Sequence, residues 1–126
     1  MLGEIAIAEW LDDALLAFDY LSKQDSVDPR RIGVSGKSFG GYMGALVSEQ
    51  RDVKSMVFQA PAVFPDEWFD KPYKLSETIK RERLLYRMSQ TALNNKAIRA
   101  IKKYTNPFLI VGSELDDTCP RNVVEG

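Results

Sequence analysis

The chain has 126 residues, of which 44% are hydrophobic and 28% are charged, and its formal net charge is −1. This size suits one domain, and the ordinary composition excludes disordered, collagen-like and low-complexity proteins. The sequence has no histidine and one cysteine, Cys119. It therefore excludes an internal disulfide, a zinc ribbon and any mechanism that needs a histidine base from within these residues.

The first predicted element is an amphipathic helix over residues 4–23. Apolar residues recur there at spacings of three and four and so share one face: Ile7, Leu11, Ala14, Phe18 and Leu21. Pro29 then moves the chain out of helical geometry. We expect a short strand at 32–35, a tight glycine-rich turn at 36–41 and a second helix at 42–50.

Two further strands are predicted at 54–60 and 108–111. An unbroken apolar run such as 108–111 is typical of a parallel strand that helices cover on both faces. The first two strands and the helix between them form a βαβ unit, which is right-handed in nearly all proteins. The sequence therefore predicts a single α/β domain over 1–126, with three layers and a mainly parallel sheet of about three strands.

The connection between the last two strands, residues 61–106, is longer than one return helix needs. Long insertions of this kind are often lids or binding loops, so we expect a helical lid or cap, with helices at about 75–90 and 93–104. Four aromatic residues stand near its start: Phe64, Trp68, Phe69 and Tyr73. They line a substrate pocket or form the insertion's own packing core, and the sequence leaves both interpretations open.

Between the first strand and the second helix lies a G-x-S-x-G pattern, from Gly36 to Gly40, followed by Gly41. A serine at a sharp strand-to-helix turn is strained and projects its hydroxyl above the sheet edge. The flanking glycines would let the strand and helix approach closely. The Phe39 amide, at the positive end of the helix, would stabilise an oxyanion. The alternative is that Ser38 is an ordinary helix N-cap.

Two segments carry a resemblance to a known superfamily: residues 27–42, VDPRRIGVSGKSFGGY, and residues 107–120, PFLIVGSELDDTCP. Both resemble the α/β-hydrolase superfamily, in particular its dienelactone-hydrolase and prolyl-oligopeptidase-like branches. The resemblance implies that Ser38 is a nucleophile, that Asp116 (or else Asp117) is the acid of its triad, and that no metal or organic cofactor is needed. The expected function is hydrolysis of carboxylic esters or small amides.

Two parts of the superfamily pattern are missing from these residues, namely the first strands with an oxyanion loop and the triad histidine. We therefore expect a partial hydrolase domain that is inactive as this isolated chain, since a serine without its base is a weak nucleophile. Esters are favoured over peptides as substrates, because no subsite for a cationic amine or for proline is visible in the sequence.

Two alternatives use the same residues differently. Gly36-Lys37-Ser38 ends as a phosphate-binding P-loop does, but the first glycine of that motif would fall at Arg31, which makes nucleotide binding the weaker interpretation. The chain could instead be a non-catalytic folded module that self-associates through the open sheet edge at 32–35.

The charge pattern and the absence of targeting signals allow predictions about binding partners and cellular location. Residues 66–104 carry five acidic and ten basic residues, but the two signs are mixed, so we predict a solvated face rather than a nucleic-acid or membrane surface. No apolar run approaches the roughly 20 residues of a membrane span, and the start lacks a signal peptide's basic residues. A cytoplasmic location is expected.

Overall fold

The computed structural model describes residues 5–72, 77–113, 115–116 and 121–125. The helices are α1 (Ile7–Ser22), α2 (Phe39–Gln50), α3 (Glu77–Arg87), α4 (Lys96–Lys103) and α5 (Arg121–Glu125). The strands are β1 (Gly33–Lys37), β2 (Ser55–Gln59) and β3 (Phe108–Val111), and short 3-10 helices occur at η2 (Pro29–Arg31), η3 (Asp66–Trp68) and η4 (Gln90–Leu93).

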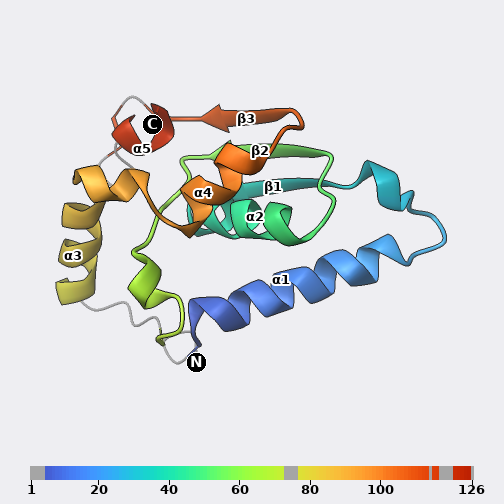
Figure 1. The fold of residues 1–126 in the computed structure, drawn as a ribbon, viewed down its shortest axis with the longest axis horizontal. Coiled ribbons are helices and arrows are strands. Elements are labelled where there is room, and N and C mark those ends of the chain that lie inside the picture. Colours follow the sequence, from blue (N-terminus) through green and yellow to red (C-terminus); the bar gives the residue numbers. More distant parts are fainter. Residues whose placement is uncertain (1–4, 73–76, 114, 117–120, 126) are drawn as a thin grey trace.

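The three strands form one parallel sheet in the order β1-β2-β3, with β2 in the middle (Figure 1). In its register Val34 pairs with Met56, and Met56 pairs with Phe108. All three strands thus end at the same edge of the sheet. The predicted partial α/β fold with a parallel sheet of about three strands is confirmed.

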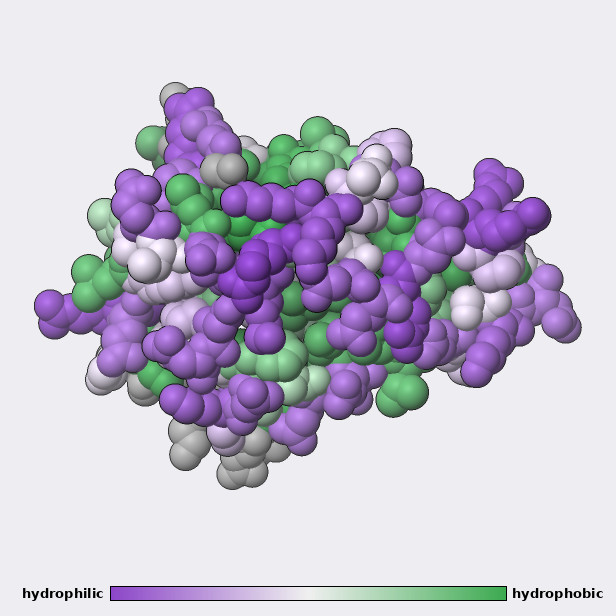
Figure 2. All heavy atoms as spheres, in the orientation of Figure 1, coloured by the Kyte–Doolittle hydropathy of each residue, from purple (hydrophilic) through white to green (hydrophobic). Residues whose placement is uncertain are grey.

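The core lies between the sheet and α2, which packs on β1 and β2, while α1 and α4 pack on α2. Side chains of β2 alternate between the two faces: Met56 and Phe58 are each 1% exposed, whereas Val57 is 44% exposed. Leu109 in β3 is 56% exposed, and Figure 2 shows apolar atoms at the surface near this strand. In a three-layer fold, helices cover both faces of the sheet. Among the described residues, the helices pack on one face only and the other face is exposed.

The boundaries of β1 and α2 differ from the expected ones. The strand runs from Gly33 to Lys37 rather than over 32–35, and the helix begins at Phe39 rather than at 42. The glycine-rich turn expected at 36–41 shrinks to the single residue Ser38. Glycines often mark turns, but here they provide room for close packing, as the site geometry shows below.

The long insertion joins the core through its second helix. Asn95 caps α4, accepting a hydrogen bond from the Ile98 N–H at 3.2 Å, and Ala97 and Ala100 are buried against α2 and its neighbours. The first helix, α3, packs on η4. Whether residues 61–106 act as a lid stays a prediction. No helix in the described ranges combines the length and the apolar character needed to cross a membrane.

Candidate active site

Ser38 forms the whole connection between β1 and α2. Its backbone has φ 51° and ψ −113°, and among the described residues that are not glycine only Ala60 shares a positive φ. Such a conformation is strained for any residue with a Cβ, and strain of this kind concentrates at functional sites. Ser38 occupies the N-cap position of α2, but its hydroxyl makes no capping hydrogen bond. The ordinary N-cap role therefore does not account for this serine.

Hydrogen bonds to the loop after β2 hold the strained turn in place. The Ser38 N–H donates to the Gln59 carbonyl at 3.0 Å, and the Ser38 carbonyl accepts from the N–H groups of Gly41 and Ala62, each at 3.0 Å. Both backbone polar groups of the serine are thus satisfied. The end of β2 and the start of the insertion therefore hold the backbone of the serine in place.

Two of the three glycines around Ser38 leave no room for a side chain, and the third does. A Cβ on Gly36 would lie 2.3 Å from the Gly40 carbonyl oxygen, and a Cβ on Gly41 would lie 2.8 Å from the Pro61 Cβ. Real Cβ atoms do not approach other atoms so closely, so both positions require glycine. A Cβ on Gly40 would meet nothing within 4 Å outside the helix's own backbone. The close approach expected on both sides of the serine is therefore a property of Gly36 and Gly41.

The same geometry excludes the phosphate-binding interpretation. Gly36 and Lys37 are part of the extended strand β1, and one residue separates them from α2. A P-loop needs a wide turn whose successive amides surround a phosphate. No such turn exists at this position, so the nucleotide-binding alternative is wrong.

The predicted oxyanion donor follows β1 and the predicted acid follows β3, and these two strands end at the same edge of the sheet. Phe39 begins α2, and the N–H groups of a first helical turn have no acceptor within their helix. Asp116 is half-buried and follows the end of β3, as Ser38 follows the end of β1. Because β2 lies between them, the axes of these two strands are about 10 Å apart. Asp117 and Cys119 lie outside the described residues.

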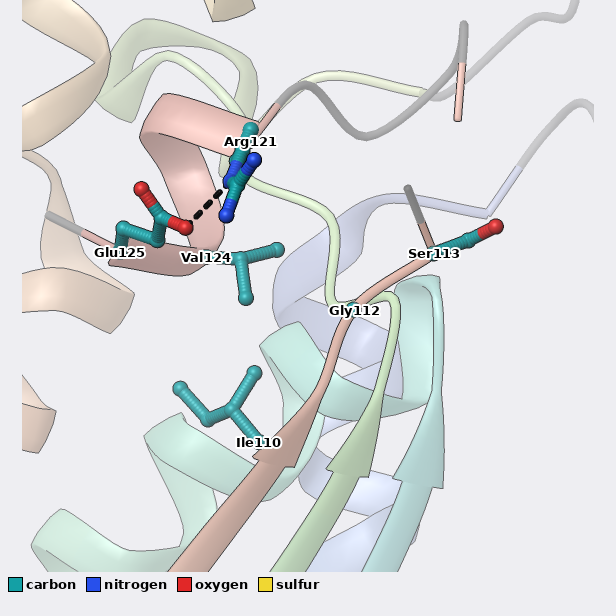
Figure 3. A pocket seen from close by; sticks show the side chains of 6 residues that line it. All are labelled: Ile110, Gly112, Ser113, Arg121, Val124 and Glu125. Carbon is teal, nitrogen blue, oxygen red and sulfur yellow. Dashed lines mark hydrogen bonds and ion pairs between the residues drawn. The ribbon is translucent and has the colours of Figure 1, made fainter. Parts of the chain in front are cut away.

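A cavity of about 540 Å³ opens beside the end of β3 (Figure 3). Ile110 and Gly112 form its strand side, and the ion pair of Arg121 and Glu125 on α5 forms the opposite side. This cavity lies next to the segment that leads to Asp116. Among the described residues, no group of three or more His, Cys, Asp or Glu side chains could hold a metal ion.

The four aromatic residues of the insertion do not share one environment. Phe64 is 2% exposed and packs on Tyr42, with ring centroids 5.0 Å apart, so it belongs to the core. Phe69 lies under the Lys96 ammonium, 4.8 Å from its ring centroid. Trp68 is half-buried and lines two cavities. Tyr73 lies outside the described residues. Of the four, Trp68 and Phe69 therefore line cavities, whereas Phe64 is part of the core.

The sequence did not point to a role for Arg87, which is 1% exposed. Its Nε donates to the Val63 carbonyl at 3.2 Å, and its guanidinium lies 5.2 Å from the centroid of the Phe64 ring. Asn122 on α5 donates to the Arg87 carbonyl at 2.8 Å. Arg87 thus links α3 to the segment that starts beside Ser38. The many charged residues at 77–87 are typical of a solvated helix, so the sequence offered no reason to expect a buried arginine there.

Comparisons with known proteins agree with this geometry. The family model described as the prolyl oligopeptidase family matches residues 8–124. The chain is also similar to a protein named uncharacterized peptidase YuxL from Bacillus subtilis (strain 168), with 27% identity over 117 residues. That match covers 86% of this chain and 17% of the relative, so the chain spans about a sixth of the relative's length. The chain belongs to the prolyl oligopeptidase family of α/β-hydrolase-type serine hydrolases.

Proposed function

We propose that Ser38 is the nucleophile of a hydrolase that cleaves carboxylic amides, peptides among them, or esters. The observation that carries this proposal is the strained backbone of Ser38 at the junction of β1 and α2, with a hydroxyl that caps nothing. The sequence favoured esters, whereas membership of a peptidase family favours the amide bond.

In this proposal the Ser38 Oγ attacks the carbonyl carbon, and the Phe39 amide donates to the oxyanion that forms. Collapse of the intermediate releases an amine or alcohol, and water then hydrolyses the acyl-serine. Asp116 would orient the histidine that removes the serine's proton. None of the 126 residues is a histidine. We therefore expect no turnover from this chain alone, because loss of the base costs roughly 10⁶-fold in serine hydrolases.

Imidazole in solution can stand in for the missing base and tests the role of Ser38. We expect a fluorophosphonate probe to give no adduct with the chain alone, and a single adduct on Ser38 when imidazole is added at high concentration. Intact-mass spectrometry followed by peptide mapping measures both results. Turnover of esters is not a suitable readout, because imidazole itself hydrolyses activated esters.

Two variants serve as controls for this labelling. Ser38→Ala should give no adduct, whereas Ser35→Ala, which removes an exposed hydroxyl three residues earlier on β1, should label as the unaltered chain does. Adduct on another residue, equal labelling of Ser38→Ala, or no adduct at any imidazole concentration would contradict the assignment.

A second candidate function is self-association, supported by the free edge of the sheet. Among the described strands, β1 pairs with β2 alone, so one side of β1 presents unpaired backbone groups. Exposed apolar residues of the sheet, Val57 and Leu109, lie on the face that the described helices leave open. Strand edges of this kind favour pairing with another chain. We propose that two copies pair through their β1 edges.

Sedimentation velocity over a hundredfold range of protein concentration tests this pairing. We expect a monomer–dimer equilibrium that Ser35→Lys shifts toward monomer, because the added charges would face each other across the paired edges. Ser26→Lys makes the same change at an exposed site away from the sheet and should leave the equilibrium unaltered. A monomer at every concentration would remove this candidate.

A further inference from the structure

The first residue after β2, Ala60, has a positive φ of 43°. Among the described residues that are not glycine, Ser38 is the one other residue with a positive φ. A Cβ makes this conformation costly, and such a conformation persists only where the surrounding contacts hold the residue in place. Pro61 adds to the cost, because a proline favours extended geometry in the residue before it. Ala60 therefore departs from its local preference because its neighbours hold it there.

Ala60 lies between Ser38 and the end of β3. The last pair in the register of β1 and β2 is Lys37 with Gln59. Ser38 and Ala60 come next on these two neighbouring strands, which lie about 4.8 Å apart. On the other side, the Ala60 N–H donates to the carbonyl of Val111, the last residue of β3, at 2.8 Å. Figure 3 shows the three strands ending side by side at this edge.

Both backbone polar groups of Ser38 are bonded by the segment that bends at Ala60. Before the bend, the Gln59 carbonyl accepts from the Ser38 N–H at 3.0 Å. After the bend, the Ala62 N–H donates to the Ser38 carbonyl, also at 3.0 Å. A strand that continued straight on would carry Ala62 roughly 6 Å further from the serine along the strand direction. The bend therefore allows one short segment, residues 59–62, to bond both sides of the serine.

Side-chain packing holds the same segment against the first turn of α2. Pro61 is buried, and a Cβ added to Gly41 would lie 2.8 Å from the Pro61 Cβ. Ala62 is 1% exposed. Ala60 is itself half-buried and packs on the core. Tight packing on both sides of the bend, together with the hydrogen bond to β3, explains how the unfavourable φ of Ala60 is maintained.

We propose that Ala60 is a positioning residue, whose positive φ lets residues 59–62 clamp Ser38 in its strained conformation. Because the Ala60 N–H also bonds β3, the same residue ties this clamp to the strand that leads to Asp116. The role belongs to the backbone conformation of Ala60 rather than to its methyl group. The clamp does not depend on the chemistry of Ser38, whereas its importance for catalysis rests on the proposed function.

Amide hydrogen exchange, followed residue by residue with nuclear magnetic resonance, tests the clamp without any turnover. Ala60→Val places a β-branched side chain at the positive φ. It should speed exchange of the Ser38 and Ala62 N–H groups by about tenfold or more relative to the amides of α4. Ala60→Gly adopts a positive φ freely and should leave both rates within about threefold of those in the unaltered chain.

Ala14→Val is the matched control. Ala14 is also half-buried and packs on the same core, but it lies within the regular helix α1. This variant should not single out the Ser38 and Ala62 amides. A second measurement needs no variant: in the unaltered chain the amides of Ser38, Ala60 and Ala62 should open together, with one opening free energy and one urea dependence. It decides the question if Ala60→Val does not fold.

Fluorophosphonate labelling with imidazole then measures what the clamp contributes to chemistry. The rate of Ser38 labelling should fall about tenfold or more in Ala60→Val and recover in Ala60→Gly. Separate opening of the three amides, or equal acceleration at α4 in Ala60→Val, would overturn the proposal and leave the hydrolase assignment intact. Selective loss of protection at Ser38 and Ala62, with no adduct in any variant, would establish the clamp and refute the hydrolase proposal.

Discussion

Gly36→Ala is expected to destabilise the chain by about 3 kcal/mol or more, a large fraction of the roughly 5–15 kcal/mol by which a typical domain is stable. The new Cβ would lie 2.3 Å from the Gly40 carbonyl oxygen and 2.7 Å from the Gly41 nitrogen, and both are backbone atoms. A backbone atom cannot move aside by changing a rotamer, so β1 and α2 would have to separate. That separation would also disturb the Ser38 hydrogen bonds to the loop after β2. Urea denaturation followed by circular dichroism measures the change.

Gly40→Ala is the matched control, because it makes the same chemical change within the same pentapeptide. Its Cβ would meet nothing within 4 Å outside the helix's own backbone, and alanine favours helices over glycine by about 1 kcal/mol. We expect this variant to be as stable as the unaltered chain or slightly more stable. Similar losses at both positions would contradict the packing argument at Gly36.

These two glycines illustrate what the sequence could and could not predict. The pentapeptide between a strand and a helix correctly placed a sharp turn at Ser38, because few other structures need a serine between two glycines there. The sequence could not distinguish Gly36 from Gly40, since that distinction depends on which way each Cα–Cβ vector points. The strand at 108–111 was readable for a similar reason, because an unbroken apolar run is a local pattern, and β3 occupies those residues.

The sequence could not predict features that depend on contacts between distant segments. Arg87 is buried because it reaches Val63, which is 24 residues away, and its own helix has the pattern of a solvated surface. A cavity of about 460 Å³ is likewise lined by residues of η3, α3 and η4, which are far apart in the sequence. Asp66 in its wall pairs with Arg99, 33 residues later in the chain.

Because the described helices cover one face of the sheet, we expect truncation of two neighbouring residues of β2 to have very different effects on stability. Phe58→Ala should cost about 3–5 kcal/mol of unfolding free energy, because this ring is 1% exposed and contacts the helix at Gly44, where an added Cβ would lie 2.7 Å from it. Val57→Ala should cost less than about 1 kcal/mol, since Val57 is 44% exposed on the other face.

The contrast between Phe58 and Val57 has a clear physical meaning, because the two residues share one strand and differ in the face they occupy. If something covered both faces, as three-layer sheets require, both truncations would be costly. Urea denaturation at low protein concentration measures each cost in the monomer, and repeating it at high concentration adds the effect of any self-association. If the loss of unfolding free energy for Val57→Ala rises with protein concentration, the outward face is buried between copies. Comparable losses for both substitutions in dilute solution would contradict the one-sided packing described above.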